Sequence, residues 1–110
     1  MAEINIPVTL VTTKFDDYNN IESGHFSATL PPNRFPAPDA RGILNEQVIP
    51  QLLKRPVGSV TLTNLARDAR GYAFSIVPHS PETKAALANL TEGESIIIPI
   101  EVDTPDDFGG

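Results

Sequence analysis

Apolar residues in this chain follow two different periods along the sequence, and this alternation restricts the fold more than any other feature. Every second residue from Ile4 to Leu10 is apolar, which is the period of a strand with one buried face. Further short strand-like segments follow at residues 25–30, 59–65, 71–78 and 95–102. Because strands dominate this order, we expect the chain to build one sheet.

A single longer segment has helical spacing instead. In "ARGILNEQVIPQLLK", residues 40–54, Leu44, Val48 and Leu52 fall on one side of a helix, which predicts an amphipathic helix. Asp39 precedes the segment and is a suitable capping residue. Pro50 has no backbone donor, so we expect it to kink or split the helix.

The connecting segments give further expectations. Residues 13–24, "TKFDDYNNIESG", predict a long loop between the first two strands. Gly71 ends "ARDARG", which predicts a hairpin turn. Ser80 and Pro81 begin "SPETKAALANL" as a cap and a first helical residue, so residues 80–90 predict a short helix. The isoleucine-rich segment 95–102 is typical of a central strand that is apolar on both faces.

The predicted order is strand, strand, helix, strand, strand, short helix, strand. This order indicates an α+β domain in which one mixed sheet carries a helix across one face. The length of 110 residues allows one domain with its own core. We therefore expect a folded domain over residues 1–102 and a flexible C-terminal tail over residues 103–110.

Composition excludes several function classes. A net charge of -6 argues against a nucleic-acid binder of the ordinary basic kind. The chain has no cysteine, which removes disulfides, thiolate nucleophiles and thiolate metal sites. The N-terminal sequence "MAEINIPVTL" has neither a basic region nor a long apolar run, so we expect no signal peptide and no membrane partner. A cytoplasmic location is the expected default.

No residue pattern indicates an active site. His25 and His79 lack any motif around them, and Ser80 is better explained as a helix cap than as a nucleophile. "DDYNNIE" lacks the glycine and the terminal glutamate that a calcium loop requires at fixed positions. There is no glycine-rich phosphate loop and no metal-ligand cluster. We therefore expect neither an enzyme nor a bound metal or cofactor.

The segment "TEGESIIIPIEV" followed by "DTPDDFGG" carries a resemblance to a known family. Together with the order of elements before it, it resembles the β-grasp fold of ubiquitin-like proteins, whose last strand leads into a flexible tail ending in Gly-Gly. The resemblance covers most of the chain in the order of its elements. At the level of residues it is specific at Gly109 and Gly110.

The resemblance implies a function for the tail. Gly110 would be activated and conjugated by an adenylating (E1-like) enzyme that binds ATP, with Gly109 beside it in the enzyme's channel. The tail residues Asp103, Asp106, Asp107 and Phe108 would contact that enzyme. The product would be a ubiquitin-like modifier joined to a target protein or small molecule. A sulfur carrier of the same fold, which ends in a thiocarboxylate, is an alternative.

A different class of function fits the same residues. The chain could be a small acidic protein-protein interaction module, such as a phage or bacterial accessory protein, that binds through the face or the edge of its sheet. Its terminal glycines would then have no chemical role. Truncation after Val102 separates the two hypotheses, because it removes the tail and leaves the predicted domain.

Overall fold

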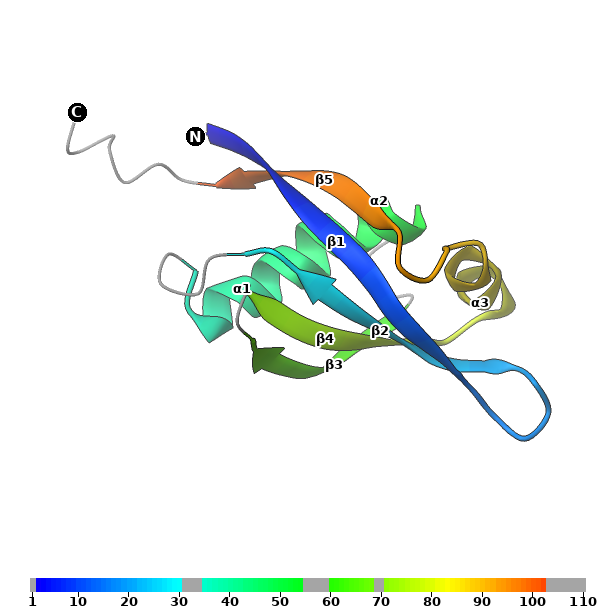
Figure 1. The fold of residues 1–110 in the computed structure, drawn as a ribbon. Coiled ribbons are helices and arrows are strands. Elements are labelled where there is room, and N and C mark those ends of the chain that lie inside the picture. The colour runs from blue at the N-terminus through cyan, green and yellow to red at the C-terminus, as the bar shows by residue number, and fades with distance from the viewer. Residues whose placement is uncertain (1, 31–34, 55–59, 69–70, 103–110) are drawn as a thin grey trace, which may run out of the picture.

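The computed structural model describes residues 2–30, 35–54, 60–68 and 71–102. The elements in chain order are β1 (Ala2–Phe15), β2 (Ile21–Ala28), α1 (Ala37–Ile43), the π-helical turn η1 (Leu44–Val48), α2 (Ile49–Leu53), β3 (Val60–Arg67), β4 (Tyr72–Pro78), α3 (Pro81–Ala88) and β5 (Ser95–Val102). Figure 1 shows these elements as one sheet with helices beside it. The predicted α+β class with a single sheet is confirmed.

The sheet is not mixed, so that part of the prediction was wrong. Its strand order is β3-β4-β2-β1-β5, and all four pairings among the described strands are antiparallel. The directions of the strands explain why β5 pairs antiparallel with β1. β1 and β4 both run opposite to β2, so they point the same way. Because α3 turns the chain at the end of β4, β5 starts from that end and pairs antiparallel with β1.

β5 lies at an edge of the sheet rather than in its centre, which corrects the prediction for residues 95–102. Its side chains alternate: Ile98 and Ile100 are buried, whereas Ile97 is 58% exposed. Pro99 suits this position, since a proline has no N–H to offer a further strand and is tolerated at a sheet edge. The run of isoleucines therefore belongs to a strand with one buried face, not to a strand that is buried on both faces.

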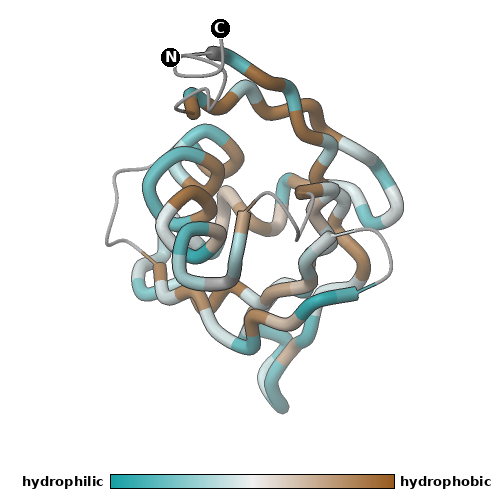
Figure 2. Tube along the Cα trace, turned by 90° about the vertical axis from the view of Figure 1, so that its left-hand side faces the viewer, coloured by the Kyte–Doolittle hydropathy of each residue, from teal (hydrophilic) through white to brown (hydrophobic). Residues whose placement is uncertain are grey.

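The helical segment from α1 to α2 lies on one side of the sheet (Figure 1). Leu44, Val48 and Leu52 are buried in the same core as the inward-facing strand residues. Figure 2, which views the molecule from the left-hand side of Figure 1, shows hydrophilic residues on the outer parts of the helical turns. The helix begins at Ala37, earlier than predicted, and Asp39 lies in its first turn and makes no capping bond.

The helical segment continues through Pro50 without a break, and a change in its hydrogen bonding accompanies the proline where a kink or split was predicted. The turn before it is π-helical, and the N–H of Ile49 donates to the carbonyl of Leu44, five residues back. Pro50 then occupies the first turn of α2, where a missing N–H leaves no helical bond unmade. The wider turn removes the clash that a proline ring makes with the carbonyl four residues before it.

The long loop predicted over residues 13–24 is not present. β1 continues to Phe15 and β2 begins at Ile21, so the connection is a short turn. The strands also contain irregularities in register, with Val11 as an extra residue in β1 and Glu22 as an extra residue in β2. Each extra residue reverses the face of the sheet on which the following side chains lie. The sequence therefore shows no continuous period of two along these strands.

The second hairpin and the short helix match their predictions. β3 and β4 form an antiparallel pair, and α3 begins with a capping box in which Ser80 and Thr83 bond each other's backbone N–H. The core beneath includes the stacked rings of Phe26 and Phe74, 5.6 Å apart. Within the described ranges, no helix has the length and apolar character needed to cross a membrane.

Candidate functional site

The residues predicted to carry the tail chemistry are Asp103, Asp106, Asp107, Phe108, Gly109 and Gly110, and they lie outside the described residues. The described chain ends with β5 at Val102, a buried residue paired with Ala2 of β1.

A groove of about 470 Å³ lies beside the end of β5. Its lining residues are Phe35, Pro38, Asp39, Gly42, Ile43, Glu46, Glu101 and Val102. They include three carboxylates and no basic residue, so the groove favours a cationic group over an anion. Within the described ranges, no three His, Cys, Asp or Glu side chains are placed so that together they could hold a metal ion.

The most prominent feature of the molecule is the projecting end of the β1–β2 hairpin, which we call the arm and define as residues 11–23. β1 pairs with β5 as far as Thr9, and β2 pairs with β4 from Gly24 onward. Between these points the two strands of the arm pair with each other, up to Phe15 opposite Ile21. Figure 1 shows the arm extending past the rest of the sheet.

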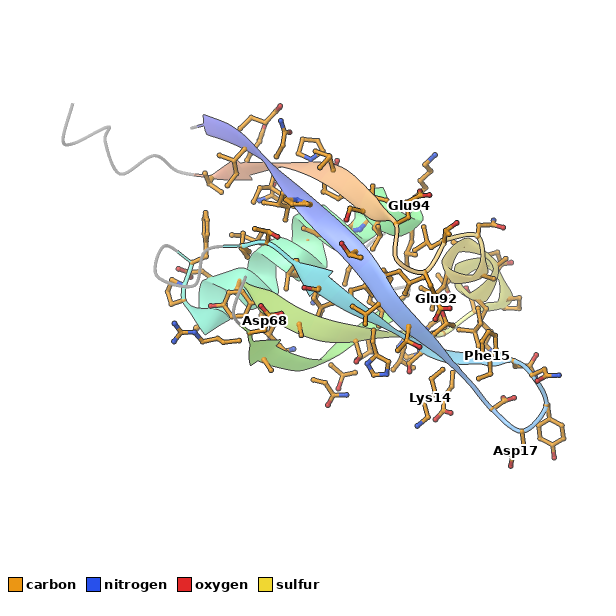
Figure 3. All side chains as sticks on the ribbon, in the orientation of Figure 1. Lys14, Phe15, Asp17, Asp68, Glu92 and Glu94 are labelled. Atoms are coloured by element: carbon orange, nitrogen blue, oxygen red, sulfur yellow. The ribbon has the colours of Figure 1, made fainter. Side chains whose placement is uncertain are left out.

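Two aromatic side chains at the end of the arm are exposed. Phe15 is 54% exposed and Tyr18 is 85% exposed. Figure 3 shows Phe15 and Asp17 at this end of the molecule. A two-stranded ribbon has no core of its own to bury such rings. Tyrosine and phenylalanine are enriched at protein–protein interfaces, so these two rings make the end of the arm a candidate binding surface.

The turn that carries Tyr18 is held in one conformation. The Oδ1 atom of Asp16 accepts hydrogen bonds from the N–H of Tyr18, at 2.8 Å, and from the N–H of Asn20, at 3.0 Å. The N–H of Asp16 donates to the carbonyl of Asn20 at 2.8 Å. Asn19 has a φ of 64°, a left-handed conformation that asparagine tolerates better than most residues. The turn therefore presents Tyr18 on an ordered backbone.

The loop between α3 and β5 supports the base of the arm. The N–H of Thr13 donates to Oε2 of Glu92 at 2.9 Å, and the N–H of Gly93 donates to the carbonyl of Leu10 at 2.8 Å. Figure 3 shows Glu92 beside the strand that leads into the arm. These bonds connect the arm to the body of the domain, so its direction is fixed by more than the hairpin alone.

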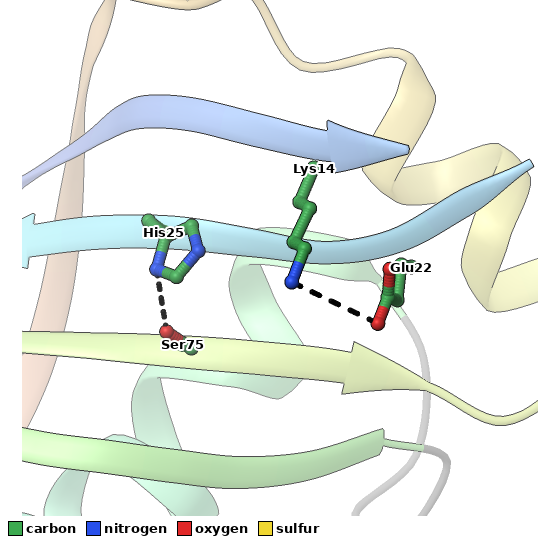
Figure 4. Close-up of polar contacts among 4 residues, drawn as sticks. All are labelled: Lys14, Glu22, His25 and Ser75. Atoms are coloured by element: carbon green, nitrogen blue, oxygen red, sulfur yellow. Dashed lines mark hydrogen bonds and ion pairs between the residues drawn. The ribbon is translucent and has the colours of Figure 1, made fainter. Parts of the chain in front are cut away.

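The open face of the sheet carries a polar cluster near the base of the arm (Figure 4). The Nδ1 atom of His25 lies 2.7 Å from the hydroxyl of Ser75. Nζ of Lys14 is 4.0 Å from Oε1 of Glu22, and both side chains are more than half exposed. An exposed pair at this distance contributes little to stability.

The geometry of the histidine and serine does not favour a catalytic pair. Ser75 is 2% exposed, so its hydroxyl is covered from a substrate. A serine nucleophile also needs its base to be oriented by a third group. Asp68, a nearby acid, instead accepts a hydrogen bond from the hydroxyl of Ser27 at 3.4 Å. His79, at the end of β4, contacts Thr61 through its Nε2 atom.

Sequence reasoning missed the arm because it assigned residues 13–24 to a loop. The residues that build the turn were nevertheless visible. Asp16 is placed to accept bonds from the N–H groups that follow it, and Asn19 is suited to a positive φ. These two residues, with apolar Phe15 and Ile21 on either side, were the available signal for a hairpin turn.

Comparison with known proteins gave no match. No protein-family model, no curated protein and no solved structure is significantly similar to this chain.

Proposed function

We propose that the chain is a protein-binding module and that the end of the arm is its main contact. The observation that carries this proposal is the exposure of Tyr18 on a turn that Asp16 holds in one conformation. Tyrosine is enriched among the residues that dominate binding energy at interfaces. An ordered turn also reduces the conformational entropy that is lost when the partner binds.

Charge around the arm indicates what kind of surface the partner presents. Asp16, Asp17 and Glu22 are acidic, and Lys14 is the basic residue of the arm. The rings of Phe15 and Tyr18 need an apolar pocket, so a matching partner has such a pocket with a basic rim. This proposal keeps the class of function that was expected for a small acidic interaction module and places its contact on the hairpin.

Substitution of Tyr18 tests the proposal. We expect Tyr18→Ala to weaken binding of the natural partner by about 2 kcal/mol or more, roughly a thirtyfold loss in affinity. Partners are captured from the source cells on the wild-type chain, and the affinity of each is then measured by calorimetry with purified components. Circular dichroism checks that the variant is folded.

Lys84→Ala is the matched control, because Lys84 is exposed on α3 and lies outside the arm. It should bind as the wild-type chain does. Equal affinity of Tyr18→Ala and wild type for every captured partner would contradict the proposal.

We infer a second candidate from the ubiquitin-like resemblance of the sequence. What supports it is that two strands precede the helical segment α1–α2, two strands and α3 follow that segment, and β5 leads into residues 103–110. In this candidate, Gly110 is activated by an adenylating enzyme and the chain is joined to a target, or leaves as a sulfur carrier. The antiparallel sheet supports it less than a mixed sheet would.

The two candidates separate on one truncation. A chain ending at Val102 keeps the arm and should bind its partner unchanged if the arm is the contact. The modifier candidate instead requires a mass shift of the full chain on incubation with its adenylating enzyme and ATP, and no shift after deletion of Gly109 and Gly110. A full chain that is not activated by that enzyme would rule out the second candidate.

A further inference from the structure

The outer edge of β5 is covered by two glutamine side chains of the helical segment. Nε2 of Gln47 donates to the carbonyl of Glu101 at 2.8 Å, and Oε1 of Gln47 accepts from the N–H of Glu101 at 2.6 Å. Nε2 of Gln51 donates to the carbonyl of Pro99 at 2.7 Å. We call these two side chains the glutamine clamp.

The clamp makes the hydrogen bonds that a neighbouring strand would make. A residue of an added antiparallel strand exchanges both an N–H and a carbonyl with the residue opposite, and the amide of Gln47 does this with Glu101. Pro99 has no N–H, so its carbonyl is the backbone group that can form a hydrogen bond at this position, and the bond from Gln51 satisfies it. The backbone polar groups of Pro99 and Glu101 at this edge are therefore satisfied without a sixth strand.

The helical segment places the two glutamines on the same side. Gln47 belongs to η1 and Gln51 to α2, on either side of Pro50. They are four residues apart, a spacing that puts side chains next to each other on a helix. Nε2 of Gln51 also donates to the carbonyl of Gln47 at 2.8 Å, which connects the two members of the clamp.

The clamp covers part of the edge. Its bonds reach Pro99 and Glu101, and among the described residues neither glutamine bonds to Ile97. Ile97 alternates in phase with Pro99 and Glu101, so its backbone also points away from β1. Its side chain is 58% exposed. An edge with exposed backbone groups and an exposed β-branched side chain is a site where another strand can pair.

We propose that the edge of β5 over residues 95–101 binds an extended, basic segment of a partner protein, which replaces the glutamine clamp. A hollow of about 320 Å³ lies at this edge, lined by Glu3, Glu46, Gln47, Pro50, Gln51, Pro99, Ile100 and Glu101. These residues include three carboxylates and no basic residue. Lysine or arginine at alternate positions of the added strand would face this negative charge.

The same charges argue against a second copy of the chain as the occupant. β5 carries Glu101, and Glu94 directly precedes it. Pairing two β5 strands would bring these acids next to the acidic hollow of the other copy, and like charges across a strand pair are unfavourable. A basic segment meets the opposite charge at the same positions.

When a strand replaces the clamp, the backbone groups of Pro99 and Glu101 keep hydrogen-bond partners of the same kind. The amide group of a glutamine side chain has the same donor and acceptor atoms as a peptide group. The incoming strand therefore replaces each clamp bond with an equivalent one and adds bonds at Ile97. Strand addition of this kind obtains affinity from the backbone and specificity from alternate side chains.

Amide NMR spectra of the full chain test the proposal with a short peptide that alternates lysine with valine. We expect shifts of the backbone amides of Ile97 and Glu101 and of the side-chain amides of Gln47 and Gln51. The doubly substituted chain Gln47→Ala, Gln51→Ala should bind the peptide about fivefold more tightly, since the clamp no longer competes for about one net hydrogen bond.

The controls are a peptide with glutamate in place of lysine and the variant Asn89→Ala, which removes an exposed amide side chain from the end of α3. The glutamate peptide should cause no shifts at β5, and Asn89→Ala should bind the lysine peptide as the wild-type chain does. If the doubly substituted chain does not fold, the titration of the wild-type chain still decides the question.

Three results would overturn the proposal. The lysine peptide could leave the β5 amides unchanged, or both peptides could shift them equally. The doubly substituted chain could instead form a dimer without peptide, as measured by light scattering, and the occupant of the edge would then be a second copy.

Discussion

Two glycines in this chain differ in whether their surroundings leave room for a side chain. Gly71 lies against the backbone that leaves β2, and an added Cβ would contact the carbonyl of Ala28 and lie 2.5 Å from the nitrogen of Leu30. Gly42, in α1, has no atom within 4 Å of the same position. Close approach of backbone to backbone therefore explains a glycine at position 71, and nothing steric requires one at position 42.

We expect Gly71→Ala to lower the free energy of unfolding by about 3 kcal/mol, since neither the backbone at Ala28 nor that at Leu30 can move without disturbing the sheet. Gly42→Ala should raise the same free energy by about 0.5–1 kcal/mol, because alanine favours a helix more than glycine does. Urea unfolding of the two variants measures both values. Equal effects of the two substitutions would contradict the close approach at Gly71.

At the scale of elements, α3 depends strongly on its first turn. Thr83 and Leu87 are its buried residues, so packing alone gives this short helix little support. The hydroxyl of Ser80 accepts from the N–H of Thr83, and the hydroxyl of Thr83 accepts from the N–H of Ser80. These bonds satisfy donors that the start of a helix otherwise leaves without partners.

Removal of this cap should be measurable. Ser80→Ala should lower the free energy of unfolding by about 1 kcal/mol, as followed by thermal or urea unfolding. Ser80→Asp is the matched variant, because aspartate caps equally well and also favours the positive end of the helix dipole. A loss of the same size in both variants would show that the cap is not the cause.

The arm is an element that the sequence did not predict. A strand is recognised from sequence by a constant period of two, and each extra residue shifts that period by one. Val11 and Glu22 are such residues, so the alternation that is clear from Ile4 to Leu10 does not continue into the arm. The polar residues around Tyr18 then resemble a loop. The hairpin, and with it the candidate site, depends on the pairing of β1 with β2. This pairing cannot be recognised from the residue pattern of either strand alone.

At the scale of the whole molecule, the sheet and the helical segment share one core. Leu44 from the helical side and Phe74 from the sheet are both fully covered within the same cluster of buried residues. Loss of packing at one of these positions should therefore weaken the entire domain, as is usual for a single domain of this size.

We expect Leu44→Ala to lower the free energy of unfolding by about 2–5 kcal/mol while the unfolding transition remains single. Ile97→Thr is the matched control at an exposed position of β5, and its effect should stay within about 0.5 kcal/mol. Urea unfolding followed by both fluorescence and circular dichroism measures these values. Two separate transitions in Leu44→Ala would contradict a shared core.

The sequence alone determined where most strands and helices lie, where α3 is capped, and that Pro50 lacks the donor of a regular helical bond. Each of these depends on neighbouring residues, through side-chain period, local hydrogen bonds or a missing donor. The tertiary structure decided the direction of β5, its place at the edge, and the contact of Gln47 with Glu101. Those features depend on residues far apart in the chain, and they form because α3 returns the chain antiparallel to β1 and the helical segment lies beside the strand edge that this return exposes.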